Sequence, residues 1–370
     1  MKPTKHNFIL FSWGILVLLL CCKKTHKFAT TPLDVNYSNH EITYSGRIDS
    51  SNQESVKLYW PGSSISLNFE GQSINALLKD SKGDSYYNVI LDNDSIFILR
   101  PDTLKSYHTL AQNLKKGKHT IEIFKRTEPH YGVTNFYSFK IEGDGKILEK
   151  SPKKKRKIEF YGNSITSGYA VEDMSGADSP DGTYTNNYLS YSAITARYFD
   201  AEYRAICKTG IGIMVSWHNI IMPEMYDRLN PHDPHTKWDF SLYQPDVAVV
   251  NLFQNDSWLF RLPENENFKK RFGEKAPSEN NIINAYKDFV SKIRAHYPNA
   301  DIICILGNMD VTKKDSKWPR YVETAVSQLK DPKIFTYFAP YKNTGNHPSI
   351  KEQQAIADGL IDFIEQKIDW

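Results

Sequence analysis

The chain has 370 residues, of which 40% are hydrophobic and 24% are charged, a composition typical of a globular protein. Its length makes two domains the natural expectation and leaves ample chain for a sizeable core. The formal net charge is only +3, so the bulk charge does not indicate a nucleic-acid partner.

The first 22 residues have the pattern of an export signal. A positively charged start is followed by an apolar run over residues 9–20, which is shorter than the ~20 residues that span a bilayer. The run ends in a cysteine pair that resembles a bacterial lipoprotein signal, and Cys22 is the better lipidation candidate because the small Cys21 precedes it. A plain secretory signal is the alternative. We expect residues 23–36 to be a polar tether in an exported lipoprotein, periplasmic or on the cell surface, whose membrane contact is the lipid alone.

Short strands broken by turns dominate residues 37–150. Apolar and polar residues alternate cleanly in Ser64-Ile-Ser-Leu-Asn-Phe69, for example, before the chain turns at Gly71. The expected strands span residues 56–60, 64–69, 87–91, 95–99, 117–124 and 134–141. Short strands at this spacing, with little helical periodicity, predict an antiparallel β-sandwich.

The pattern changes in residues 151–370, where apolar strands alternate with amphipathic helices. The expected strands span residues 157–161, 202–206, 246–252, 301–306 and 333–338, and the expected helices span 187–199, 281–296, 317–330 and 349–367. This alternation predicts a doubly wound, five-stranded parallel sheet with helices on both faces. Cys207 and Cys304 fall in strand-like runs and are expected to be buried free thiols. No Cys/His cluster has the spacing of a zinc site.

Four polar positions follow predicted strands or lie in their connecting loops. They are Ser164, directly after the strand-breaking Gly162-Asn163, then Gly210, Asn255 and His347. The carboxyl ends of parallel strands form the ligand-binding edge of such sheets. A serine exposed there beside a base can act as an acyl-transfer nucleophile. Each position also has a structural explanation, namely a tight turn, a helix cap or a surface histidine before a helix. Their joint occurrence favours a shared site.

These blocks resemble those of the SGNH (GDSL-type) hydrolases. The matching stretches are Gly162-Asn-Ser164-Ile-Thr, Thr209-Gly210-Ile-Gly212, Asn251-Leu-Phe-Gln-Asn255-Asp256 and His347-Pro-Ser. The first half resembles the jelly-roll domain that precedes this fold in carbohydrate esterase family two, through Tyr44-Ser-Gly-Arg47, Trp60-Pro-Gly62-Ser, Asn68-Phe-Glu-Gly71 and Lys125-Arg-Thr-Glu128. The resemblance extends from about residue 40 to 366. It implies a jelly-roll sandwich over residues 37–150, an SGNH domain over 151–370, and deacetylation of polysaccharides such as acetylated xylan or mannan.

The resemblance also implies residue roles. Ser164 would be the nucleophile and His347 the general base and acid. The backbone N–H groups of Ser164 and Gly210, together with the side-chain amide of Asn255, would form the oxyanion hole. No metal or organic cofactor is implied.

Two departures from the family pattern concern the loops. Asn163 stands where an aspartate is usual, and it can still form local hydrogen bonds. Phe253 stands where a glycine is expected, and we expect its ring to narrow the acyl pocket. Phe253 and Trp258 are therefore candidate substrate contacts, and we expect a preference for small acyl groups.

A third departure concerns the acid that usually precedes the histidine by two or three residues. Thr344 and Gly345 occupy those positions. A Ser–His dyad, in which a backbone carbonyl such as that of Gly345 orients the ring, is one possibility. An acid from elsewhere in the chain is the other, with Asp310 as a weak candidate.

The leading hypothesis is thus a serine esterase that deacetylates polysaccharide through an acetyl-enzyme, using a dyad or a triad. One alternative is a non-catalytic glycan-binding lipoprotein on a degenerate hydrolase scaffold. Another is an SGNH esterase for a lipid or sialic-acid acyl ester. The sequence leaves the oligomeric state open.

Overall fold

The computed structural model describes Met1 and residues 31–370, so the predicted export signal and Cys22 lie outside the described residues. Within the described part of the chain, no helix is long and apolar enough to cross a membrane. Part of the predicted tether proves to be a strand, β1 (Leu33–Asn36), which pairs antiparallel with residues 138–141. The prediction was wrong for these four residues because a single edge strand carries little periodicity of its own.

Residues 33–147 form the predicted sandwich, with two six-stranded antiparallel sheets. The remaining strands of this half are β2 (Thr43–Ser45), β3 (Ile48–Asp49), β4 (Val56–Leu58), β5 (Ser64–Glu70), β6 (Ser73–Asp80), β7 (Tyr87–Leu91), β8 (Ser95–Leu99), β9 (Ser106–Ala111), β10 (Lys118–Lys125), β11 (Thr134–Glu142) and β12 (Lys146–Ile147). One sheet has the order β3-β4-β11-β6-β9, with β1 on β11. The other has the order β12-β5-β10-β7-β8, with β2 on β5.

The core of the sandwich consists of the alternating apolar residues of both sheets. Ile65, Leu67 and Phe69 of β5 are at most 1% exposed, and they belong to the same cluster as Phe136 and Phe139 of β11. The six predicted strands are all present. Strands β6 and β9 were not predicted; they pair with each other, and β9 is the edge strand of the first sheet.

Residues 156–338 contain the predicted parallel sheet. Its strands are β13 (Arg156–Gly162), β14 (Ala201–Cys207), β15 (Val247–Asn251), β16 (Asp301–Leu306) and β17 (Ile334–Phe338). All four neighbouring pairs are parallel, and the order is β14-β13-β15-β16-β17. Each strand lies within one residue of its predicted range at either end. Cys207 and Cys304 are buried free thiols, as predicted.

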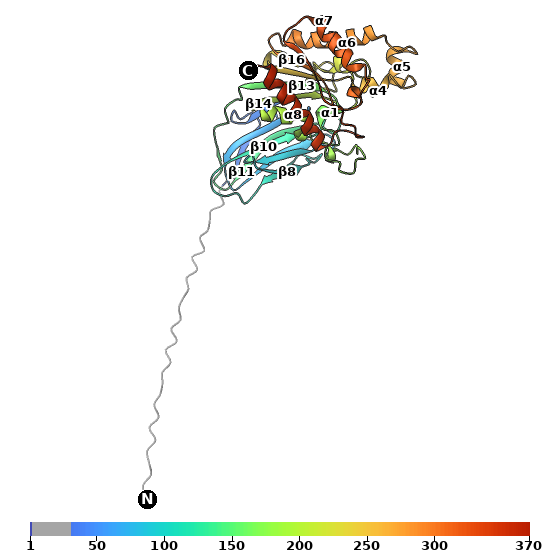
Figure 1. The fold of residues 1–370 in the computed structure, drawn as a ribbon. Coiled ribbons are helices and arrows are strands. Elements are labelled where there is room, and N and C mark those ends of the chain that lie inside the picture. Colours follow the sequence, from blue (N-terminus) through green and yellow to red (C-terminus); the bar gives the residue numbers. More distant parts are fainter. Residues whose placement is uncertain (2–30) are drawn as a thin grey trace.

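Helices cover both faces of this sheet. They are α1 (Ser164–Ser167), α2 (Tyr191–Tyr198), α3 (Met222–Met225), α4 (Gln254–Leu259), α5 (Glu266–Phe272), α6 (Glu279–His296), α7 (Trp318–Leu329) and α8 (Ile350–Lys367). Apolar residues of α6 and α7 pack on one face, and those of α2 and α8 pack on the other. Figure 1 shows α8, in dark red, apart from α6 and α7, in orange. The four predicted helices are present, and the doubly wound architecture is confirmed.

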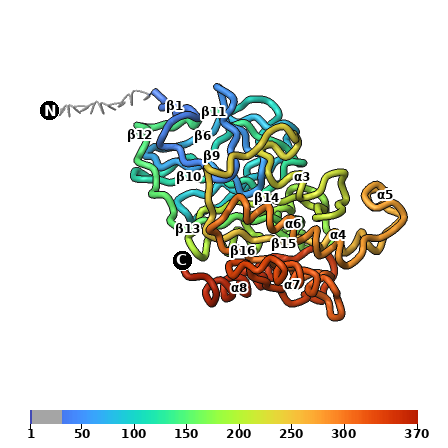
Figure 2. The backbone as a smooth tube through the Cα atoms, turned by 90° about the horizontal axis from the view of Figure 1, so that it is seen from above, coloured from blue at the N-terminus to red at the C-terminus, as the bar shows by residue number. Residues whose placement is uncertain are grey.

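The two halves pack directly against each other. Figure 2 shows the blue-to-cyan sandwich beside the sheet and helices of the second half. Arg47 of the sandwich is fully buried, and its guanidinium donates to Glu159 of β13 at 3.2 Å and to the Tyr226 carbonyl at 2.5 Å. The indole of Trp60 donates to the Leu229 carbonyl at 2.9 Å. These buried contacts hold one edge of the sandwich against the second half of the chain.

Candidate active site

The candidate residues gather where the order of the parallel sheet reverses. Strand β13 lies between β14 and β15. The chain runs from β13 to β14 on one side and then crosses back to β15 on the other side. In open α/β sheets such a point opens a crevice at the carboxyl ends of the strands. Ser164 follows β13, Gly210 follows β14, and Asn255 follows β15. The topology therefore brings together three of the four predicted positions.

Ser164 is presented by a tight strand-to-helix turn. A Cβ at Gly162 would lie 1.9 Å from the hydroxyl of Thr166, so only glycine fits at the strand end. The side-chain oxygen of Asn163 accepts from the N–H of Ile165 at 3.0 Å and caps α1. As the first residue of α1, Ser164 has an N–H that no intrahelical carbonyl can accept. That donor is available to a ligand.

His347 contacts the serine directly. Its Nε2 lies 2.8 Å from the Ser164 Oγ, and its Nδ1 lies 2.9 Å from the Oδ2 of Asp178. An ionised carboxylate can only accept, so Nδ1 carries the ring proton and Nε2 is left as the acceptor for the serine hydroxyl. The ring of Tyr169 packs edge-on against the imidazole, with centroids 4.8 Å apart. This is the arrangement of a nucleophile, a base and an orienting acid.

The acid beside His347 corrects the sequence-based expectation. The Gly345 carbonyl accepts from Lys342 Nζ instead of the imidazole, so the predicted backbone-carbonyl dyad is wrong. The alternative of an acid from elsewhere in the chain matches the structure, but the candidate Asp310 contacts Trp258 and Arg261. Asp178 takes this position.

The carboxylate of Asp178 has a pKa below its ordinary value. Partial burial acts to raise this pKa, but hydrogen bonds from the ring and backbone N–H of His347 lower it by more, and the charge of Lys342 adds to the effect. The carboxylate is therefore ionised at neutral pH. Nothing in the sequence singles out Asp178 from Asp173 and Asp181 in the same loop. A search for acidic residues in the loop after β13, the first strand of the parallel sheet, would have included Asp178.

Asn255 and Asp256 organise the loop that follows β14. The Asn255 amide donates one N–H to the Ile211 carbonyl at 2.8 Å. Its other N–H, like the backbone N–H groups of Ser164 and Gly210, has no hydrogen-bond partner within the described part of the chain. Three free donors at neighbouring strand ends can stabilise a developing oxyanion.

The neighbouring Asp256 binds the backbone of the same loop. Its carboxylate accepts from the N–H groups of Ile213, Met214 and Val215 at 2.7–3.1 Å. Complete burial raises its pKa to about 6, although these three hydrogen bonds act in the opposite direction. A Cβ at Gly212 would lie 2.5 Å from this carboxylate. The loop therefore needs glycine there for packing, in addition to Gly210, whose φ is +77°.

Comparison with known proteins agrees with this geometry. Residues 44–151 match the family described as "Carbohydrate esterase 2 N-terminal". A solved family-two carbohydrate esterase from Clostridium thermocellum, in complex with cellohexaose, is 31% identical. The match covers 88% of this chain and 99% of that one, with a TM-score of 0.79. The chain belongs to carbohydrate esterase family two.

Two curated relatives extend the comparison. An acetylxylan esterase/glucomannan deacetylase from Cellvibrio japonicus is 25% identical over 360 residues, which cover 95% of this chain and 96% of the relative. A cellulase/esterase from Acetivibrio thermocellus is 33% identical over 343 residues, but this chain spans only 40% of its length. The predicted family is confirmed. This chain therefore matches the first relative over nearly its whole length, whereas it matches only a part of the second, longer relative.

The predicted substrate contact at Phe253 is wrong. Its ring is 0% exposed and packs against Tyr286 and Trp318 in the core, so it cannot narrow an acyl pocket. The backbone explains why the family has glycine here: Phe253 has φ +77°, in the left-handed region. Trp258 is partly buried and donates to Asp310, so its contact with substrate stays a prediction.

Another aromatic side chain, that of Trp217, lies beside Gly210. Trp217 is 42% exposed, and its backbone N–H donates to the Gly210 carbonyl at 3.0 Å. Trp217 is not among the predicted site residues, because a tryptophan in a loop has no periodicity that marks it as exposed.

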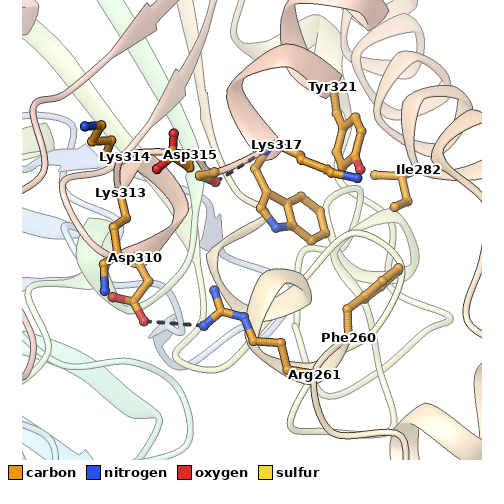
Figure 3. A pocket seen from close by; sticks show the side chains of 11 residues that line it. Phe260, Arg261, Ile282, Asp310, Lys313, Lys314, Asp315, Lys317 and Tyr321 are labelled. Carbon is orange, nitrogen blue, oxygen red and sulfur yellow. Dashed lines mark hydrogen bonds and ion pairs between the residues drawn. The ribbon is translucent and has the colours of Figure 1, made fainter.

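A surface pocket lies away from Ser164 and His347, beyond the C-terminal end of α4. It has a volume of about 320 Å³, and neither Ser164 nor His347 lines it. Arg261 and Asp310 form an ion pair at its edge, with an N–O distance of 4.0 Å (Figure 3). Trp318 is one of the residues that line it. Its lysines and arginine are accompanied by carboxylates, so it does not present one sign of charge.

Proposed function

We propose that this protein is a serine esterase that removes O-acetyl groups from a xylan- or mannan-like polysaccharide through an acetyl-enzyme intermediate. The observation that carries the proposal is the unbroken chain of hydrogen bonds from Ser164 through His347 to Asp178. The names of the family-two relatives, which include acetylxylan esterase and glucomannan deacetylase, support the substrate class.

The first half-reaction forms the acetyl-enzyme. The Ser164 Oγ attacks the acetyl carbonyl carbon while His347 Nε2 takes the hydroxyl proton. The carbonyl oxygen becomes an oxyanion that accepts hydrogen bonds from Gly210, Asn255 and the Ser164 N–H. Because these donors are held in place by the fold, they stabilise the charge without reorganising. Asp178 keeps Nδ1 protonated and balances the charge of the imidazolium.

The tetrahedral intermediate then collapses to the acetyl-enzyme. The bond between the carbonyl carbon and the sugar oxygen breaks, and the imidazolium of His347 gives its proton to that oxygen, releasing the free hydroxyl. Water next attacks the acetyl-enzyme with the same histidine as base. Acetate leaves, and Ser164 regains its proton. Each proton transfer uses His347, so the described side chains account for a complete cycle.

The surroundings of the site fit a sugar polymer. The exposed ring of Trp217 lies beside the Gly210 loop and offers an apolar face on which a sugar ring can stack. A family-two relative was solved in complex with cellohexaose, which supports a β-linked chain as the partner. We propose Trp217, and with it Trp258, as substrate contacts.

The cellular location is also a proposal. The leader pattern and Cys22 support export followed by lipid attachment, with the lipid as the membrane contact. A polysaccharide substrate fits a protein that faces the outside of the cytoplasm.

The test compares the wild type, Ser164→Ala and a surface control, Ser241→Ala, on an aryl acetate and on acetylated xylan. We expect the wild type and Ser241→Ala to release acetate at equal rates and Ser164→Ala to lose at least ~10³-fold. Equal rates for the wild type and Ser164→Ala would refute the proposal. Parallel assays with lipid and sialic-acid acetyl esters separate the substrate alternatives. The non-catalytic alternative has two grounds, a missing acid and an aromatic-rich sandwich that can stack sugars, and the contact of Asp178 with His347 speaks against the first. Glycan binding without Ser164-dependent turnover would favour that alternative.

A further inference from the structure

A buried carboxylate of the sandwich domain reaches the oxyanion loop. Glu128, just after β10, is 0% exposed. Its Oε1 and Oε2 lie 2.8 and 2.9 Å from the backbone nitrogen of Thr209, and the Thr209 hydroxyl donates to Oε1 at 2.6 Å. Thr209 directly precedes Gly210. A side chain of the first half of the chain thus holds the residue next to a proposed oxyanion donor.

The other side of the same residue is held by a histidine. His218 Nε2 donates to the Thr209 carbonyl at 2.8 Å. This carbonyl and the Gly210 N–H belong to one planar trans peptide and point in opposite directions. Fixing the carbonyl therefore also fixes the direction of the Gly210 N–H. Glu128 and His218 together clamp the peptide that supplies that donor.

Glu128 remains charged despite its burial. Burial acts to raise its pKa, but the hydrogen bond and charge of His130, the charge of Lys208 and a hydrogen bond from Ser167 lower this pKa to about 2. A buried charge is costly unless it is hydrogen-bonded and paired. The N–H and hydroxyl of Thr209 make shorter hydrogen bonds to this carboxylate, at 2.6–2.9 Å, than His130 does at 3.1 Å, so the loop and the carboxylate stabilise each other.

The backbone around Glu128 is itself anchored to the second half of the chain. The carbonyl of Arg126 accepts from the Asn187 N–H at 3.0 Å. Its guanidinium donates to the Thr183 and Thr185 carbonyls at 2.8 and 3.2 Å and pairs with Glu172. These contacts restrain the backbone between Arg126 and Glu128, and they therefore fix where the Glu128 carboxylate lies.

We propose that Glu128 is a positioning residue for the oxyanion hole. The sandwich domain then contributes directly to catalysis, because one of its side chains orients an oxyanion donor of the second domain. Glu128 does not touch the substrate, since its side chain is fully covered. It acts through Thr209 on the Gly210 N–H. The proposal rests on the proposed esterase function.

The experiment measures kcat and KM for an aryl acetate in the full chain carrying Glu128→Gln. The amide keeps the shape but replaces one acceptor with a donor facing Thr209. We expect kcat to fall ~10–100-fold with KM within ~2-fold, because the donor matters most for the oxyanion. Thr209→Val, which removes the hydroxyl alone, is expected to lower kcat ~3–10-fold. The double variant is expected to fall no further than Glu128→Gln, because both changes act on one contact.

A matched control separates positioning from a general loosening of the two halves. Trp60→Phe removes another interdomain hydrogen bond, to the Leu229 carbonyl, and is expected to leave kcat within ~2-fold. An equal loss in Trp60→Phe overturns the proposal, as does an unchanged kcat in folded Glu128→Gln. If Glu128→Gln does not fold, an unchanged kcat in Thr209→Val overturns it. A wild type without Ser164-dependent turnover overturns the proposed function and this inference together, whereas the other outcomes leave the function standing.

Discussion

Asp178 holds His347 at two points, although 169 residues separate them in the sequence. Its carboxylate accepts from the ring Nδ1 at 2.9 Å and from the backbone N–H at 2.9 and 3.1 Å. The second contact fixes the main chain that carries the imidazole, and the first fixes the rotation of the ring. A single side chain therefore determines both the tautomer and the direction of the base.

Asp178→Asn tests this relationship. The amide can present an N–H to Nδ1 and favour the wrong tautomer, so we expect kcat/KM for an aryl acetate to fall ~10²–10⁴-fold with the fold intact. Asp310→Asn is the matched control, because Asp310 contacts Trp258 and Arg261 instead of His347. Less than a threefold loss in Asp178→Asn, or an equal loss in both variants, contradicts the assignment.

Asn255→Ala tests the side-chain donor of the oxyanion hole. We expect kcat to fall ~10²–10³-fold with little change in KM, because this hydrogen bond strengthens only as the oxyanion forms. Steady-state kinetics on an aryl acetate measure both constants. Asn219→Ala is a suitable control, since Asn219 is a surface residue that contacts Lys270. A rise in KM with kcat preserved would show that Asn255 binds substrate instead of stabilising the oxyanion.

Glu128 also predicts a pH dependence of stability. Its pKa of about 2 in the folded state lies below the ordinary value of 4.5. Between these pH values the unfolded chain binds more protons, so the stabilisation present above pH 4.5 is lost as the pH falls toward 2. At pH 7 we expect Glu128→Gln to be less stable than the wild type by up to ~3 kcal/mol. Urea unfolding at several pH values measures this gap, and a gap that stays constant down to pH 2.5 contradicts the prediction.

The buried pair between Arg47 and Glu159 predicts a large effect on stability. Both side chains are 0% exposed, so removing one partner leaves an uncompensated buried charge. We expect Arg47→Met to lower the free energy of unfolding by ~3–5 kcal/mol and the addition of Glu159→Gln to recover part of this loss. Lys57→Met, at a more exposed pair with Asp49, is expected to cost ~1 kcal/mol or less. Similar losses in the two single variants would show that burial does not decide the outcome.

Phe253→Gly separates packing from specificity. Glycine relieves a left-handed backbone that costs ~1–2 kcal/mol for other residues, but it removes a fully buried ring whose loss costs ~3–5 kcal/mol. We therefore expect a net destabilisation of roughly 2–3 kcal/mol. Because the ring does not reach the site, the ratio of acetate to butyrate hydrolysis is expected to stay within ~2-fold. A clear shift toward the longer ester would contradict the burial of Phe253.

Much of the architecture could be predicted because it follows from local patterns. The central strands β15 and β16 are buried almost throughout and appear as apolar runs. The four long helices each have one apolar side. Strands β6 and β9 were harder to predict, since polar residues interrupt the apolar pattern of both. Strand β9 is the edge strand of its sheet and β6 is its neighbour. The single-turn helices α1 and α3 were also missed, because one helical turn has too few residues to show a period.

The same distinction holds for the site. Ser164, Gly210, Asn255 and His347 could be found because each lies within a few residues of a strand end or a helix start, in the chain order of the family's sequence blocks. Phe253 was misjudged for the opposite reason. Phe253 does lie between β15 and Asn255, next to the site in sequence. Its backbone is left-handed, however, and its ring is buried in the core.

The sequence by itself determined the two-part architecture and the family, and it singled out Ser164 and His347 as the proposed nucleophile and base, because these depend on periodicity and on motifs a few residues long. Only the tertiary structure decided how His347 is held and how the Gly210 peptide is clamped. Asp178 and Glu128 lie in loops whose composition resembles many others. They reach the site because distant segments pack together, and no local pattern records which of several loop carboxylates ends within hydrogen-bonding distance of an imidazole or a peptide N–H.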